Sequence, residues 1–185
     1  MQTAAWQGPP HDILGHPVPI EQFVVRTDDT VVALQHALAF REGCCFTLQV
    51  AVRRGSADET TWKGLTDRHS TRGFPPEPTD ADLKFGVRFP DGSKATTVGN
   101  AFHGWANPAE RPEAPRLVDA GGGFSSDDRY YQGEQRLWLW PLPPPGPFEF
   151  VIEWRKRGID ATPAVLDGSA VMHAAEKARP YWPLS

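Results

Sequence analysis

The chain has 185 residues, of which 39% are hydrophobic and 23% charged, and its formal net charge is −4 at pH 7. This length suits one domain that buries a core without disulfides or metals, and the negative charge argues against general nucleic-acid binding, which needs a clustered positive field. No apolar run reaches the roughly 18 residues of a membrane helix, and the first ten residues do not look like a secretory signal. We therefore expect no nucleic-acid partner and no membrane partner.

The two cysteines, Cys44 and Cys45, are adjacent in the sequence. Neighbouring side chains of an extended segment point to opposite faces, so a disulfide between them would be strained. Two unpaired thiols favour a reducing compartment, and we expect a cytoplasmic location. One thiol is expected in the core and the other at the surface. A catalytic thiol is the alternative, although no histidine stands at a motif spacing from either cysteine.

Nineteen prolines and 17 glycines favour short elements joined by many turns. The clearest pattern has period two, which is typical of half-buried strands. It predicts strands over 30–40 and 44–54, joined by a short turn as an antiparallel hairpin. The side chains expected to share one face of the first strand are Val32, Leu34, His36, Leu38 and Phe40. We interpret His36 as a core histidine rather than a metal ligand.

Further strands and one helix follow from the same reasoning. A second hairpin is predicted to turn at Asp91-Gly92, because this pair readily adopts the positive backbone angles of a tight turn. The helix is predicted over 167–180, with Ser169 as its cap and Pro180 as its end. The other predicted strands cover residues 20–27, a short edge near Leu117, and residues 83–89, 137–142 and 148–155.

Seven or eight strands in a meander-like order with one C-terminal helix indicate an all-β protein. We predict a two-sheet antiparallel sandwich, immunoglobulin-like or jelly-roll, with long loops and one short C-terminal helix. Its expected parts are an N-terminal arm over 1–17, the sandwich over 18–166, and a helix and tail over 167–185 packed on the sandwich. The expected long loops, 55–82 and 99–115, are rich in proline, glycine and small polar residues.

Aromatic residues are concentrated in one stretch, RLWLWPLPPPGPFEFVIEW, at residues 136–154. Its second strand alternates between apolar and polar residues, but residues 137–142 have no polar face. Both faces of that strand must therefore be covered, by a loop, a helix or a partner. We expect Trp138 and Trp140 to contribute to an interface with another protein or within a homo-oligomer.

No motif for a phosphate loop, a nucleophile elbow or a zinc site is present, so we expect no cofactor and no metal. Two loops nevertheless hold groups that could bind a polar ligand. Residues 66–73 contain two arginines and a histidine, and residues 102–107 contain aromatic rings beside a histidine and an amide. The candidate ligand-binding residues are Arg68, His69, Arg72, His103, Trp105, Asn107, Tyr130 and Tyr131.

These features favour a non-catalytic binding or protein-interaction module that recognises its ligand with the long loops at one end of the sandwich. Two alternatives stay open. One is a cytoplasmic hydrolase, whose acid and base would come from His103, His69, Asp67 and Asp119. The other is a carbohydrate-binding module, whose sugar-stacking rings would come from Trp62, Trp105, Tyr130 and Tyr131.

The chain contains LKFGVRFPDGSKATT, then GGG, then LWLWPLPPPGPFEFVIEW. In these segments it resembles a group of uncharacterised β-rich proteins from high-GC bacteria, and the resemblance runs from about residue 18 to residue 160. That group has no established activity. The resemblance therefore implies one soluble β-domain and carries over no catalytic residue.

Overall fold

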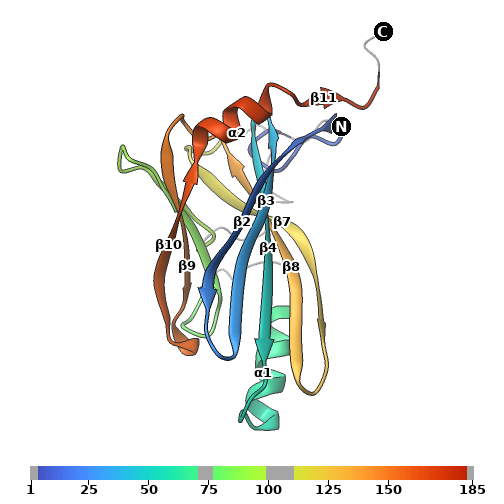
Figure 1. Ribbon diagram of the computed structural model, residues 1–185, viewed down its shortest axis with the longest axis vertical. Coiled ribbons are helices and arrows are strands. Elements are labelled where there is room, and N and C mark those ends of the chain that lie inside the picture. Colours follow the sequence, from blue (N-terminus) through green and yellow to red (C-terminus); the bar gives the residue numbers. More distant parts are fainter. Residues whose placement is uncertain (1–3, 71–76, 99–110, 183–185) are drawn as a thin grey trace.

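The computed structural model describes residues 4–70, 77–98 and 111–182, except for the side chains of His69 and Ser70 (Figure 1). The described chain is mostly antiparallel β-sheet, so the prediction of an all-β protein is confirmed. Two large sheets form the body, and two short helices lie at its opposite ends. None of the helices in the described part of the chain is long and apolar enough to cross a membrane.

The larger sheet has five strands in the spatial order β2-β3-β4-β8-β7. Its strands are β2 (His16–Arg26), β3 (Thr30–Phe40), β4 (Gly43–Arg53), β8 (Tyr130–Trp140) and β7 (Arg116–Ser126). Every neighbouring pair is antiparallel. The predicted hairpin of residues 30–54 is confirmed, whereas the short edge strand expected near Leu117 is an eleven-residue strand.

The smaller sheet has four strands in the order β10-β9-β5-β6. Its strands are β10 (Ile159–Asp167), β9 (Pro147–Trp154), β5 (Lys84–Arg88) and β6 (Lys94–Thr96). The predicted turn at Asp91-Gly92 joins β5 to β6, and Gly92 adopts the left-handed φ of 88° that favours glycine there. The pattern analysis missed β10, because Pro163 interrupts its run of apolar residues.

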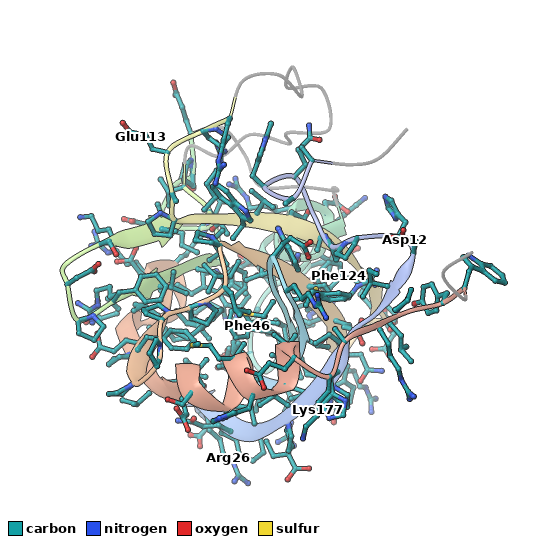
Figure 2. All side chains as sticks on the ribbon, turned by 90° about the horizontal axis from the view of Figure 1, so that it is seen from above. Asp12, Arg26, Phe46, Glu113, Phe124 and Lys177 are labelled. Carbon is teal, nitrogen blue, oxygen red and sulfur yellow. The ribbon has the colours of Figure 1, made fainter. Side chains whose placement is uncertain are left out.

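One hydrophobic core lies between the two sheets. Phe46 of β4 contacts Phe150 of β9 edge to face, with ring centroids 5.2 Å apart, and lies 6.3 Å from Phe148. Figure 2 shows Phe46 in the interior, surrounded by side chains of both layers. The layers also approach each other along their edges, where β10 lies beside β2 and β6 beside β7. Apolar side chains from nearly every strand are thereby removed from water.

A β-bulge in β3 corrects the predicted face of that strand. The pairing of β3 with β4 shifts between Leu34 and His36, so that one residue is inserted into the alternation. Val32 and Leu34 point into the main core, but beyond the bulge Ala37 and Ala39 take over that side. The remaining residues expected on the core face therefore do not join the main core, and His36 is only half-buried.

A second apolar cluster lies on the outer face of the five-stranded sheet. Its buried members are Trp6, Phe40, Cys45, Val118, Trp138 and Trp140. The cover is the N-terminal arm, which we define as residues 4–14. Trp138 donates a hydrogen bond of 2.9 Å from Nε1 to the carbonyl oxygen of Ala5, and its ring meets Phe40 edge to face at 5.7 Å.

The second cluster corrects the predicted role of the two tryptophans. Trp138 is fully buried and Trp140 is 5% exposed, so neither ring is available to a partner. The sequence correctly indicated that both faces of this strand are covered. The cover is the chain's own arm, assisted by the guanidinium of Arg111, which lies 4.9 Å from the Trp140 ring.

The C-terminal segment begins with α2 (Gly168–Ala175), which packs on β2, β3 and β9. Asp167 caps the helix by accepting a hydrogen bond from the backbone N–H of Ser169. The Ser169 hydroxyl, which was the predicted cap, instead accepts from the backbone N–H of Gly146. Because the helix ends before residue 180, Arg179 and Pro180 are free to form the short strand β11, which pairs with β1 (Ile13–Leu14).

Removal of the Trp6 ring tests whether the arm is an integral part of the fold. Trp6 is 5% exposed, so Trp6→Ala should lower the free energy of unfolding by about 3 kcal/mol. Trp182→Ala is the matched control, because that ring is 74% exposed and should be nearly neutral. Urea unfolding followed by circular dichroism measures both changes. Equal stabilities of the two variants would show that the arm contributes nothing.

Candidate functional site

Four connections between strands gather at one end of the molecule, at the bottom of Figure 1. They are the turns at residues 27–29 and 127–129, the helix α1 (Glu59–Ser70) with the residues beside it, and the single 3-10 turn η2 (Arg155–Arg157). We call this surface the α1 end. It contains much of the polar chemistry that the sequence analysis singled out.

The helix α1 corrects the expectation that residues 55–82 are one long loop. Asp58 precedes the helix and accepts hydrogen bonds from the backbone N–H and the hydroxyl of Thr61. Trp62 and Leu65 lie three residues apart and bury one face of the helix against the main core. This capping residue and this spacing were the signals available in the sequence. Gly64 and the threonines obscured them, because they favour helix less than most residues do.

Hydrogen bonds from side chains to the backbone attach α1 to the turn at 127–129. The indole N–H of Trp62 donates to the carbonyl oxygen of Asp127 over 2.9 Å. Arg54 donates from Nε to the carbonyl oxygen of Ala57 and from Nη1 to that of Asp128. The helix therefore lies against the β7–β8 hairpin as a fixed element. Sequence reasoning did not identify Arg54 or Trp62 as positioning residues, because the carbonyl oxygens of Asp127 and Asp128 that they contact are distant in the chain.

The turn at 127–129 is held by its own first side chain. The carboxylate of Asp127 accepts hydrogen bonds of 2.7 Å from the backbone N–H groups of Arg129 and Tyr130. These two donors hold the pKa of Asp127 below its usual value, because they stabilise the charged form. Asp127 thus shapes the hairpin turn, and the exposed side chains of Asp128, Arg129 and Tyr130 project from it.

An ion pair ties η2 to the turn at 27–29. Arg157 lies 2.7 Å from the carboxylate of Asp29 and donates from Nε to the hydroxyl of Thr30 over 2.7 Å. Burial alone would raise the pKa of Asp29, but the Thr30 hydroxyl and the Arg157 guanidinium outweigh it and lower that pKa. This contact joins the edge of one sheet to the edge of the other at the α1 end.

Arg68, one of the predicted ligand-binding residues, forms an ion pair with another residue of the chain. Its Nη1 lies 3.1 Å from Oδ1 of Asp82, whose carboxylate also accepts from the backbone N–H and the hydroxyl of Thr79. Burial alone would raise the pKa of Asp82, but the Thr79 N–H and the Arg68 guanidinium lower it overall. Arg68 therefore anchors α1 to the residues that enter β5, while about half of its side chain stays exposed.

The other predicted ligand-binding residues are only partly brought together. Tyr130 is 53% exposed at the α1 end, and Arg53 is its neighbour across the sheet. Tyr131 is 1% exposed and stacks on Phe124, so it is not accessible to a ligand. The residues outside the described part of the chain are Arg72, His103, Trp105 and Asn107, together with the side chain of His69.

The two carboxylates proposed for a hydrolase lie on different elements. Asp67 is exposed on α1, whereas Asp119 is on β7, where it accepts hydrogen bonds from the side-chain amide of Gln135 and the backbone N–H of Gly121. Trp62 is 6% exposed, so this ring is not available for stacking on a sugar. Within the described ranges, no group of three or more His, Cys, Asp or Glu side chains could hold a metal ion.

The two thiols are both buried, which corrects the expectation of a surface cysteine. Cys44 belongs to the main core and Cys45 to the second cluster, so they lie on opposite faces of β4 as an extended strand requires. Burial raises the pKa of Cys45 to about 11 and that of Cys44 well above its usual value. Both are therefore protonated at neutral pH, which opposes a nucleophilic role.

No protein-family model matches the chain, and no curated protein is detectably similar to it. Function is therefore inferred from the geometry of the α1 end.

Substitution of Asp82 tests the ion pair that anchors α1. Asp82→Asn should lower the free energy of unfolding by about 2 kcal/mol at pH 7, because hydrogen bonds to a buried charge are lost. Since the folded-state pKa of Asp82 is lowered, its contribution is present above the unfolded value of about 4 and is lost as the pH falls through the folded value. The difference from the wild type should therefore shrink in acid.

Asp80→Asn provides the control for Asp82. Its side chain is 67% exposed and its ion pairs are long, at 3.9 Å, so the change should cost less than about 0.5 kcal/mol. Chemical denaturation between pH 7 and pH 3 measures both variants. A pH-independent loss in Asp82→Asn would contradict a charged role for Asp82.

The thiols supply a second test. In the native protein at pH 8, neither thiol should react with a disulfide reagent on the timescale of an exposed cysteine, because both are buried and protonated. Both should react at once in guanidinium chloride. The absorbance of the released chromophore measures the two rates. Rapid native labelling would reveal an accessible thiolate.

Proposed function

We propose that the protein is a non-catalytic binding module that recognises another protein with the connections at the α1 end. One observation supports this function above the others: connections from both sheets are tied into one surface by side-chain contacts. The Trp62–Asp127 hydrogen bond joins α1 to a hairpin of the five-stranded sheet, and the Arg157–Asp29 ion pair joins the two sheets.

A surface fixed in this way is suited to binding. Association is weakened by the entropy lost when loops become ordered, so loops that are already held contribute more of their contact energy to affinity. Binding residues are found disproportionately on loops positioned by a rigid scaffold. At the α1 end, the scaffold is the two-layer β body, and α1 itself is attached to it by the buried Trp62.

The exposed side chains of this surface fit a protein partner. Tyr130 presents an aromatic ring, and Arg53, Asp128 and Arg129 surround it with charges of both signs. Tyrosine and arginine are enriched in protein–protein interfaces, because each combines apolar contact area with hydrogen-bonding groups. The surface is not uniformly positive, which would be expected for a nucleic-acid partner. The two free, buried cysteines favour a cytoplasmic location.

We further propose that the two layers form a sandwich of the immunoglobulin-like type. Strands β3-β4-β8-β7 follow the order A-B-E-D of that fold, and β10-β9-β5-β6 follow G-F-C-C′. As in that fold, the chain forms two consecutive strands in one sheet and then two in the other, from β3 to β10. Strand β2 is an additional strand beside β3, which corresponds to A. In this comparison α1 lies in the B–C connection and η2 in the F–G connection. Variable domains of antibodies use that end for recognition, and this analogy supports the α1 end as the binding surface.

The test compares capture by two matched double variants. The immobilised wild type is incubated with lysate of its own organism, and bound proteins are quantified. Tyr130→Ser/Arg129→Glu alters the α1 end. Tyr181→Ser/Arg179→Glu makes the same changes at the other end, where Tyr181 is equally exposed at 53%. We expect a partner that is retained by the wild type and the control and at least tenfold depleted from the α1-end variant. Equal retention by both variants would contradict the proposal.

A further inference from the structure

Each of the two large sheets ends in two edge strands, and three of these four edges carry features that discourage pairing with another strand. Strand β2 contains Pro17 and Pro19 and is interrupted by two register shifts. Strand β10 contains Pro163 and a register shift of its own. Strand β6 is only three residues long. Prolines, bulges and short length are devices by which proteins prevent sheets from joining edge to edge.

The fourth edge, β7, lacks these devices over its second half. Residues 122–126, with the sequence GGFSS, contain no proline and no charged side chain. They pair with β8 in unbroken register, from Gly122 opposite Gln135 to Ser126 opposite Tyr131. All five residues except Phe124 are exposed. Figure 1 shows β7 at the outer margin of the five-stranded sheet, so no further strand of that sheet pairs with this stretch on its outer side.

The bulge in β7 marks where the open stretch begins. The register shifts between Asp119 and Gly122, and Gly121 adopts a left-handed φ of 95°. The carboxylate of Asp119 accepts a hydrogen bond from the Gly121 N–H, which occupies a backbone donor there. Residues 116–119 pair regularly with β8 before the bulge, and residues 122–126 pair regularly after it. Five residues match the usual length of a strand in a sheet.

Phe124 would obstruct this edge if its ring projected sideways, but the ring is held back over β8. It stacks on Tyr131 with ring centroids 5.4 Å apart and the planes 18° from parallel. Gly133 lies opposite Phe124 in the register, and a Cβ atom at Gly133 would overlap the Phe124 ring. The glycine therefore provides the space into which the ring leans. The edge stays free of a protruding large side chain.

We propose that residues 122–126 of β7 pair antiparallel with the same residues of a second copy of this chain. A two-fold axis through Phe124 places Gly123 opposite Ser125 of the second copy, and Gly122 opposite Ser126. The pairing joins two five-stranded sheets into one of ten strands. In this two-fold interface both copies use the same surface patch, which is the usual arrangement in homodimers.

The composition of the stretch favours a second copy as the occupant. In the antiparallel self-pairing, each cross-strand pair joins a glycine to a serine, apart from the central pair of Phe124 residues. No like charges face each other. A charged or bulky partner strand would gain no complementary side chain from glycines and serines. A single pair of strands buries little surface, so the dimer is expected to be weak and its population to depend on concentration.

Sedimentation across a range of protein concentrations tests the pairing. The wild type should move from monomer to dimer as its concentration rises. Ser125→Lys adds an exposed charge to the edge and should raise the dissociation constant roughly tenfold or more. Gln132→Lys is the matched control, because Gln132 is exposed on β8 directly opposite Ser125, one strand away from the edge. The control should dimerise as the wild type does.

A covalent trap locates the contact. In the double variant Gly123→Cys/Ser125→Cys, the proposed register brings residue 123 of one copy opposite residue 125 of the other on the same face. Gly123 has space for a side chain, since no atom lies within 4 Å of its ideal Cβ position. Mild oxidation should yield disulfide-linked dimers, and the wild type, whose thiols are buried, should yield none. A monomer at all concentrations with no cross-link, or a dimer insensitive to Ser125→Lys, would overturn the proposal.

Discussion

The two-sided burial of β8 is the constraint on which the arrangement of the molecule depends. Leu137 and Leu139 point into the core between the sheets, while Trp138 and Trp140 point outward into the second cluster. An outer sheet face is ordinarily in contact with water, so two outward indoles require a cover. The arm supplies it from the start of the chain. This cover occupies the half of the molecule away from α1, so polar connections at the α1 end remain available for contact.

Alternation of apolar and polar residues predicted most strands, because it reports directly on which side chains meet the core. It failed where the backbone departs from regular pairing. The bulge at His36 moves later side chains to the other face, and a residue pattern contains no marker for that insertion. It also failed for β10, in which Pro163 lies on an edge strand, the one place in a sheet that tolerates proline. Both wrong predictions concern a bulge or an edge strand, and these features depend on how the strands pair in the folded sheet.

The sequence located the candidate site more loosely than the strands. It identified residues 66–73 and Tyr130 as polar or aromatic groups outside the core, but it placed Arg68 in a loop and Tyr131 at the surface. Arg68 lies on a helix because Asp58 caps it and Trp62 buries it, and Tyr131 is buried because alternation along β8 directs it inward. Two contacts that attach α1, from Trp62 to Asp127 and from Arg54 to Asp128, join a side chain to a distant carbonyl oxygen. Such contacts leave no trace in residue spacing, since every residue has a carbonyl.

The pairing of β1 with β11 has a mechanical consequence. Ile13 faces Pro180 and Leu14 faces Arg179, so the first and last strands of the described chain are fastened to each other beside α2. A force pulling the two ends apart would act first on this two-residue ladder and would peel the arm from the Trp138 face. The long ladders of the five-stranded sheet would bear load only afterwards. The β1–β11 pairing would thus break before the two large sheets unfold. The α1 end would keep its structure under a force that has already separated the strands at the opposite end.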